Sequence, residues 1–331
     1  MELDSLLNGA PAETALRSLI ERGWGQLPYP GAGHTLDRWR VFSAVAQRDL
    51  AWAKLLESHA DALAILRELG HAESATSNEL WATWCAEPSD ARLEFRRAGD
   101  RSESVRLHGL KAWCSGANIV TQALVSGWNE AGQPCLVAVP MAQTGVRVTR
   151  DGWQAVGMAA TASVNVVFEG ACGMPVGPPG GYVKRAGFMH GAAGVAACWY
   201  GAATAIAVEV RRFLQGRRED PHALAHLGAL DVALTQAADQ LRLTAAEIDA
   251  RPGDSCLQAV RRTRLSVETA VETVLTRAPR ALGAAPLCKN ARLARLLADL
   301  PVYIRQSHAE RDLELHGRSI LNGIEKSAWM L

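Results

Sequence analysis

The feature that most constrains this fold is a double change in hydrophobic periodicity along the chain. Between Pro11 and about Gly70, and again from about Gly187 onward, apolar residues recur at the spacing of a helix. Between about Ala91 and Glu169, short runs rich in Val and aromatic residues follow period two and are separated by Gly, Asn, Asp or Pro. The order of helices, strands and helices is not the alternation of a doubly wound fold, and it predicts an α+β protein.

Three domains are expected from this order. They are an N-terminal helical domain over residues 1–84, a central antiparallel β-barrel or sandwich over 85–180, and a C-terminal four-helix bundle over 181–331. The bundle should open with a buried helix of about 30 residues, or about 45 Å, from Gly187. Further helices are expected over 221–250, 256–278, 287–299 and 302–329, with breaks at 251–253, at Pro279 and near Pro301.

Composition excludes several classes of protein. The 331 residues include 35 Lys and Arg against 34 Asp and Glu, and this balance argues against nucleic acid as the main partner. No run of 18 apolar residues is present, so we expect no membrane span, and the N-terminus lacks the layout of a secretion signal. The seven cysteines include no CxxC motif, which indicates neither a disulfide framework nor a zinc site. We therefore expect a cytoplasmic protein without a metal.

Two short segments have the residue types of a ligand site. Trp113 and Ser115 stand two positions apart at the end of a predicted strand, where side chains alternate, so an aromatic plane and a hydroxyl can share one face. Taken alone, Trp113 is expected to be ordinary barrel core. The second segment begins at Cys85 in the sequence CAEPSD, and it is either a ligand-facing loop or a simple connector.

A third segment, VYIRQSHAERDLELHGR, has the residue types of acid–base catalysis. His308 and Asp312 are one helical turn apart, as are Gln306 and Glu310. Such a His–Asp pair can transfer protons. The density of charge around it favours the other interpretation, an exposed helix face with ion pairs.

Five segments in the correct order resemble the acyl-CoA dehydrogenase family over most of the chain. LHGLKAWCSGA is similar to the strand whose Trp and hydroxyl residue contact the flavin ring in that family, and CAEPSD is similar to the loop that commonly contains Thr-Glu-Pro. The other three are GQLPYPGAGHTLDRW, GMAATASVNVVFEGACGMP and GAAGVAACWYGAATA.

The resemblance implies a non-covalently bound FAD. Trp113 and Ser115 would lie against the isoalloxazine ring, with the backbone of Cys85 and Ala86 nearby. It also implies a homodimer or homotetramer in which Arg217, or its neighbour Arg218, reaches the flavin pyrophosphate of the partner subunit. The implied partners are an acyl thioester of CoA or of a carrier protein, and a flavoprotein or oxygen as electron acceptor.

The sequence departs from the family at the catalytic base. The family position that normally holds a catalytic Glu is occupied by Gln306, and an amide cannot take up a proton. The family's alternative position falls near Lys184 and Arg185, which are not bases of this kind either. His308 and Glu310 are the nearest candidates for the catalytic base.

Three hypotheses follow. The first is an FAD-dependent oxidoreductase that desaturates an acyl thioester between Cα and Cβ, with His308 or Glu310 as base. The second keeps the fold and the flavin but makes the protein a monooxygenase that uses reduced flavin and oxygen, since relatives of that kind lack the catalytic Glu. The third is a catalytically silent family member that acts as a binding or assembly subunit.

Overall fold

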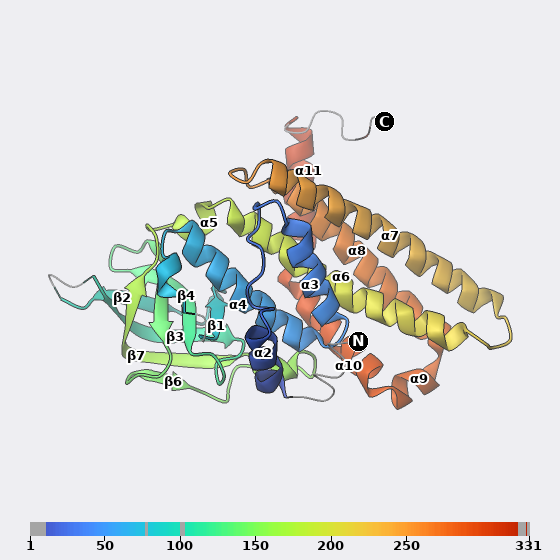
Figure 1. The fold of residues 1–331 in the computed structure, drawn as a ribbon, viewed down its shortest axis with the longest axis horizontal. Coiled ribbons are helices and arrows are strands. Elements are labelled where there is room, and N and C mark those ends of the chain that lie inside the picture. Colours follow the sequence, from blue (N-terminus) through green and yellow to red (C-terminus); the bar gives the residue numbers. More distant parts are fainter. Residues whose placement is uncertain (1–10, 77–78, 100–102, 324–328, 330–331) are drawn as a thin grey trace. The chain divides into compact units, whose positions relative to one another are not determined.

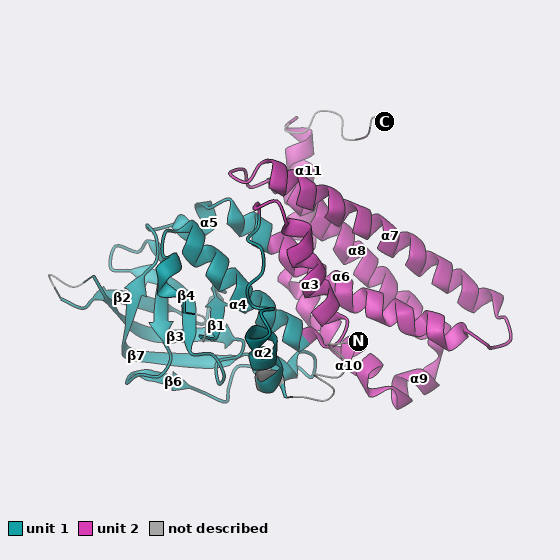
Figure 2. Ribbon diagram, viewed as in Figure 1, with its two compact units in different colours: residues 1–30, 51–191 teal, residues 31–50, 192–331 magenta. Residues whose placement is uncertain are grey.

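The structure, a computed structural model, describes residues 11–76, 79–99, 103–323 and 329. The chain folds into two compact units, which Figure 2 shows in different colours. Unit 1 comprises residues 1–30 and 51–191, and unit 2 comprises residues 31–50 and 192–331. The division into three domains at residues 84 and 180 stays a prediction.

Unit 1 is built around one seven-stranded sheet that closes into a barrel (Figure 1). Its strands are β1 (Trp81–Trp84), β2 (Leu93–Arg97), β3 (Val105–Cys114), β4 (Gln122–Asn129), β5 (Pro134–Pro140), β6 (Val146–Val148) and β7 (Val164–Pro175). The ring runs β4-β2-β3-β7-β5 and closes because β5 also pairs with β4. β1 pairs with the first half of β4, and β6 pairs with β7. The predicted barrel is confirmed.

The expectation of a wholly antiparallel barrel is wrong. β4 runs parallel to β1 and to β2, while the remaining pairs are antiparallel. The sequence also indicated strands only from Ala91 onward, so β1 was missed. The reason is that β1 has no polar face, because Trp81, Ala82 and Trp84 are all buried. A strand covered on both sides reads as a continuous apolar run rather than as an alternation.

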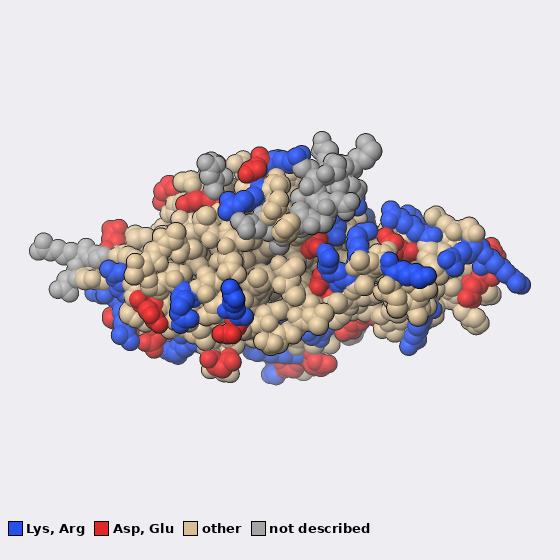
Figure 3. All heavy atoms as spheres, turned by 90° about the horizontal axis from the view of Figure 1, so that it is seen from below, with Lys and Arg blue, Asp and Glu red and all other residues tan. Residues whose placement is uncertain are grey.

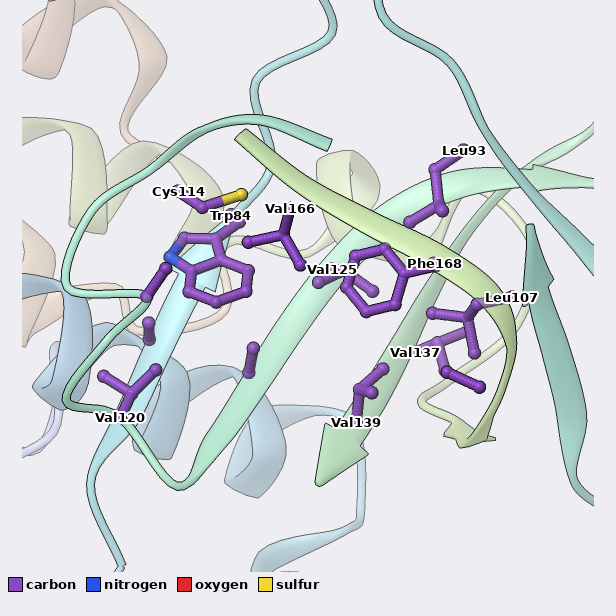
Figure 4. Packing of buried hydrophobic residues seen from close by; sticks show 14 of the residues in the cluster. Trp84, Leu93, Leu107, Cys114, Val120, Val125, Val137, Val139, Val166 and Phe168 are labelled. Carbon is purple, nitrogen blue, oxygen red and sulfur yellow. The ribbon is translucent and has the colours of Figure 1, made fainter. Parts of the chain in front are cut away.

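In β2 and β7 the residues that face the barrel interior follow period two. Leu93 and Phe95 of β2 point inward, as do Val166 and Phe168 of β7, and each pair is separated by one less buried residue. Figure 4 shows Leu93, Val166 and Phe168 packed against Leu107, Val125, Val137 and Val139 from the neighbouring strands. Burying each large apolar side chain stabilises the fold by about 1.5–3 kcal/mol.

Helix α4 (Leu50–Glu68) covers the outer face of part of this sheet. Its residues Ile65 and Leu66 pack against Trp81, Leu124 and Leu136, whose side chains point away from the barrel interior. The other helical segments of unit 1 are short: α2 (Ala12–Glu21), η1 (Ala72–Ser74), η2 (Ala159–Thr161) and α5 (Gly181–Lys184). Two layers of apolar residues, one inside the barrel and one beneath α4, therefore fix the strands that present the candidate site.

Unit 2 is helical in its described residues. It contains α3 (Thr35–Ala46), most of α6 (Gly187–Leu214), α7 (Pro221–Ala250), α8 (Leu257–Leu282), α9 (Ala284–Lys289), α10 (Ala291–Tyr303), η3 (Ile304–Gln306) and α11 (Glu310–Leu321). The helical C-terminal region and the expected bounds of the helix over 221–250 are confirmed. Asp220 caps α7 by accepting hydrogen bonds from the backbone N–H groups of His222 and Ala223.

Three of the helices expected in unit 2 differ from the prediction. α8 continues through Pro279 to Leu282, and α10 continues through Pro301 to Tyr303. A proline breaks a helix less strictly when neighbouring packing holds the turn, and Leu282 and Tyr303 are both buried. The single helix expected over 302–329 is instead η3 followed by α11, and residues 324–328 of that range lie outside the described part of the chain.

One helix in the described residues, α6, is long and apolar enough to cross a membrane by length and composition alone. However, 61% of its most apolar window is buried inside the protein, as in the core helix of a folded unit. The surface agrees with the near-zero net charge, because Lys and Arg side chains are interspersed with Asp and Glu side chains on the face shown in Figure 3.

Candidate functional site

The strongest candidate site in unit 1 is the segment 113–116, called the turn below, which comprises the last two residues of β3 and the first two of the turn that follows. Trp113 is 50% exposed, although Ala112 and Cys114 on either side of it are buried. Its backbone is left-handed, with a φ of 57°, and the β3–β7 register shifts between Lys111 and Cys114. The expectation that Trp113 is barrel core is therefore wrong. The bulge takes its side chain out of the in–out alternation and presents the indole to solvent.

Contacts from three other elements hold this turn in place. The indole Nε1 of Trp84 donates a hydrogen bond of 3.0 Å to the carbonyl of Ser115, and the N–H of Gly116 donates one of 2.8 Å to the carbonyl of Thr161. Gly116 has a φ of +72°, and a Cβ there would lie 2.9 Å from Cδ2 of Leu55 in α4. Only glycine fits this position without strain.

Beneath the turn lies a chain of buried hydroxyl groups. Oγ of Ser115 lies 2.7 Å from Oγ of Ser163, which lies 2.7 Å from Oγ1 of Thr161. The Thr161 hydroxyl donates a hydrogen bond of 2.7 Å to the carbonyl of Met158. All three hydroxyl-bearing residues are at least nine-tenths buried. Ser115 was predicted from the sequence, whereas Thr161 and Ser163 were not. Their only signal in the sequence is a Thr and a Ser two positions apart in a run of small residues.

Backbone strain is concentrated around the same hydroxyl chain. Met158 and Ala162 have φ values of 58° and 44°, and with Trp113 they make three of the five non-glycine residues of positive φ among those described. A left-handed backbone at such residues costs of the order of 1 kcal/mol or more each. Strain of this kind persists only where the surroundings over-determine the conformation, and it clusters at functional sites.

An ion pair between the buried Lys111 and the partly exposed Glu87 anchors the strand that leads into the turn. The side chain of Lys111 is 2% exposed. Its ammonium donates a hydrogen bond of 2.6 Å to Oε1 of Glu87 and hydrogen bonds of 2.9 Å to both the carbonyl and the hydroxyl of Ser126. The Ser126 hydroxyl also donates to Glu87. Three donors thus meet three acceptors, which is what a buried ammonium requires. The segment CAEPSD is therefore tied to β3 through Glu87.

Cys85 and Ala86, predicted to lie near the cofactor, stand at the start of that segment. Ala86 is exposed and Cys85 is half-buried. Desolvation raises the pKa of the Cys85 thiol to about 11. The positive charge of Lys111 and a hydrogen bond with the Tyr182 hydroxyl lower this pKa by smaller amounts. At neutral pH this sulfur is a protonated thiol rather than a nucleophile. Any role of Cys85 in the site is therefore one of shape.

The remaining predicted site residues belong to unit 2. Arg217 is exposed, and its guanidinium lies 3.9 Å from the ring centroid of Phe213. The His308 side chain is 66% exposed, and its Nδ1 lies 3.8 Å from Oδ1 of Asp312. Glu310 is exposed in the first turn of α11. The assignment of these residues to pyrophosphate binding and to proton transfer stays a prediction.

The expectation that residues 306 and 310 share one helix is wrong. η3 ends at Gln306, and Ala309 has a left-handed φ of 44°, so α11 starts afresh at Glu310. His308 lies before the helix, and its backbone N–H donates a hydrogen bond of 3.1 Å to Oδ2 of Asp312. The carboxylate of Asp312 is thereby engaged in closing the start of α11, as N-terminal acidic residues commonly are.

The turn in unit 1 has the chemistry to hold a flavin. An exposed indole, kept out of the core by the backbone, offers a flat apolar face, and the Ser115 hydroxyl beside it can hydrogen-bond one edge of a planar heterocycle. Among residues 11–76, 79–99, 103–323 and 329, no group of three or more His, Cys, Asp and Glu is placed to hold a metal ion.

Comparison with known proteins was informative for structure but not for sequence. No protein-family model matches the chain, and no curated protein matches it. TdsC from Paenibacillus sp. A11-2, a dibenzothiophene monooxygenase solved with FMN and indole, matches with a TM-score of 0.78 at 18% identity, covering 94% of this chain and 88% of TdsC.

Two further structures match as well. KijD3, solved with FMN and a dTDP-linked amino-keto sugar, has a TM-score of 0.79 at 20% identity and covers 96% of this chain and 88% of its own. The methanesulfinate monooxygenase MsuC from Pseudomonas fluorescens has a TM-score of 0.77 at 20% identity, with coverage of 94% and 88%. The chain therefore has the fold that TdsC, KijD3 and MsuC share, which is the acyl-CoA dehydrogenase fold.

Proposed function

We propose that this protein is a flavin-dependent monooxygenase. The observation that carries the proposal is the half-exposed Trp113, held by a left-handed backbone beside the buried Ser115 hydroxyl. Two proteins that share the fold, TdsC and KijD3, have been solved with FMN. FMN is accordingly our choice of cofactor in place of the FAD that the family resemblance implied. A bound reduced flavin supplies two electrons to dioxygen, so that one oxygen atom enters the substrate and the other leaves as water.

The residues of this chain have positioning roles in that reaction. Trp113 provides the face on which the ring rests, and Ser115 contacts its edge. Lys111 and Glu87 fix the strand end from which Trp113 projects. A rigid platform of this kind places a reactive ring without reorganisation at the moment of reaction.

The missing catalytic base supports a monooxygenase over a dehydrogenase. Desaturation of a thioester needs a group that takes the α-proton, and Gln306 cannot do so. At the alternative family position, Arg185 is engaged with Glu68 through a bond of 2.9 Å. Transfer of an oxygen atom does not require that base.

Acyl thioester desaturation is the second candidate function. One observation favours it: Glu310 is an exposed carboxylate with no ion pair or hydrogen bond to the described residues, so it is available to accept a proton. A homo-oligomer is proposed for either function, as are the cytoplasm as compartment and an organic small molecule as substrate. Nucleic acid is not a proposed partner.

Two assays on the purified protein separate these candidates. In the first, protein loaded with oxidised FMN is mixed anaerobically with a panel of acyl-CoA thioesters. We expect no bleaching of the flavin, and bleaching would contradict the proposal in favour of the dehydrogenase. In the second, reduced FMN, ¹⁸O₂ and a panel including dibenzothiophene, indole and methanesulfinate are supplied. A product heavier by one ¹⁸O atom is expected. Failure to take up any flavin would support a silent binding subunit instead.

A further inference from the structure

The chain of buried hydroxyls beneath Trp113 has a direction that can be deduced by counting protons. A hydroxyl has one proton to donate and two lone pairs. The carbonyl of Met158 can only accept, so the contact of 2.7 Å commits the Thr161 proton to it. The Ser163 hydroxyl lies 2.7 Å from Thr161 and 2.7 Å from Ser115. With the Thr161 proton already used, Ser163 must donate to Thr161.

The same count then fixes Ser115. Because the Ser163 proton points to Thr161, the contact between Ser115 and Ser163 is satisfied only if Ser115 donates. The Ser115 proton is thus directed inward, and the two lone pairs of its oxygen are left to accept hydrogen bonds from a group beside the turn. Reversing the chain would set the Thr161 and Met158 oxygens against each other at 2.7 Å without a proton between them. Burial makes such an unsatisfied contact costly.

We infer that Thr161 and Ser163 are positioning residues that hold the Ser115 hydroxyl as a hydrogen-bond acceptor toward the bound ring. The inference rests on the proposed function and deepens it. An acceptor prefers a ligand edge that carries N–H groups. The ring nitrogens of an oxidised flavin that change on reduction are acceptors, whereas a reduced flavin carries N–H there. The site should therefore favour reduced over oxidised flavin, which suits an enzyme that receives its flavin already reduced.

The direction of this hydroxyl chain is set by buried groups in residues 158–163, the segment that precedes β7, and not by a charge. Carbonyl and hydroxyl dipoles fixed in a region of low dielectric act more strongly than the same groups in water. The preference should therefore persist when the ionic strength is raised, unlike one caused by a surface charge.

The test is the ratio of the dissociation constants of oxidised and reduced FMN, measured through the midpoint potential of the bound flavin. The wild type should have a potential above that of free FMN. Thr161→Val removes the acceptor for the Ser163 proton and lets the chain reverse, so we expect the ratio to fall about tenfold, which is about 30 mV for a two-electron couple. Ser163→Ala deprives Ser115 of its inward acceptor and should lower the ratio at least as much.

Two controls separate polarity from damage to the fold. Thr161→Ser keeps the hydroxyl and should retain the wild-type potential. In a Ser115→Ala background, Thr161→Val should have no further effect on the potential, since the two residues act as one unit. Thermal unfolding of each variant checks that the barrel is intact.

The outcomes are distinguishable. If FMN binds but Thr161→Val and Ser163→Ala leave the potential unchanged, or raise it, the inference is wrong while the proposed function stands. If the wild-type protein binds no flavin in either redox state, the proposed function fails first. If Thr161→Val still changes the midpoint potential in the Ser115→Ala background, its effect does not pass through the Ser115 hydroxyl. That result would overturn the assignment of Thr161 as a positioning residue for Ser115.

Discussion

The turn at residues 113–116 in unit 1 and the segment 306–310 in unit 2 are alike in one respect and opposite in others. Each contains a non-glycine residue with a left-handed backbone, Trp113 in the first and Ala309 in the second. In the turn, Ser115 and the groups beneath it are buried and hydrogen-bonded, and one aromatic side chain is exposed. In the segment, the side chains of His308 and Glu310 are exposed and charged or polar.

This difference separates two kinds of sequence signal. Residues 305–314 contain a dense run of charges that suggested a catalytic role. Most of these residues form the exposed start of α11, and runs of charge are commonly exposed helix faces of this kind. The signal at 111–116 was weaker, yet there the structure puts strain, buried polar groups and an exposed indole together. Fixed polar groups in a region of low dielectric contribute more to binding than mobile surface charges.

The largest expected effect concerns stability. Glu87→Ala leaves the Lys111 ammonium, whose side chain is 2% exposed, with only neutral acceptors. Because the Glu87 side chain is itself 33% exposed, losing this charge-assisted bond should lower the free energy of unfolding by about 1.5–3 kcal/mol. Urea denaturation, followed by circular dichroism, measures it.

The matched control lies in the other unit. Glu314→Ala removes an exposed ion pair with Arg318 on α11 and should change the free energy of unfolding by less than about 0.5 kcal/mol. Equal losses in the two variants would contradict the contrast between a buried anchor and a solvated face.

The smallest expected effect is on turnover. If the protein is a monooxygenase, His308→Asn and Glu310→Gln should each change kcat by less than about twofold, because neither residue is required to take an α-proton. Steady-state rates of ¹⁸O incorporation provide the measurement. A loss of two or more orders of magnitude in either variant would restore the acid–base role that the sequence suggested for this segment.

Much of the fold could be predicted because it depends on periodicity. Alternating residues in β2, β3 and β7 predicted the barrel, and the small apolar residues of α6 predicted a long buried helix. Strand direction could not be predicted, since the parallel pairing of β4 with β1 and β2 depends on contacts distant in sequence. The continuation of α8 through Pro279 depends likewise on tertiary packing.

The candidate site could be predicted only in part. Trp113 and Ser115 were found through a resemblance between short segments, because an aromatic and a hydroxyl two positions apart leave a trace in the sequence. Thr161 and Ser163 left almost none, since Ser163 reaches Ser115 across 48 residues of chain and Thr161 contacts Ser163 through a left-handed bend at Ala162. The exposure of Trp113 was likewise hidden, because a bulge reverses the alternation that predicts burial.

The most direct measurement is a titration of FMN into the wild-type protein and into Trp113→Ala, followed by flavin fluorescence. The control is Trp128→Ala, which removes a tryptophan of β4 that lies 5.2 Å from the guanidinium of Arg92 on the same barrel. We predict that Trp113→Ala weakens FMN binding at least tenfold, or about 1.4 kcal/mol, while Trp128→Ala leaves it unchanged. Equal affinity of the wild type and Trp113→Ala for FMN would contradict the assignment of this turn as the flavin platform.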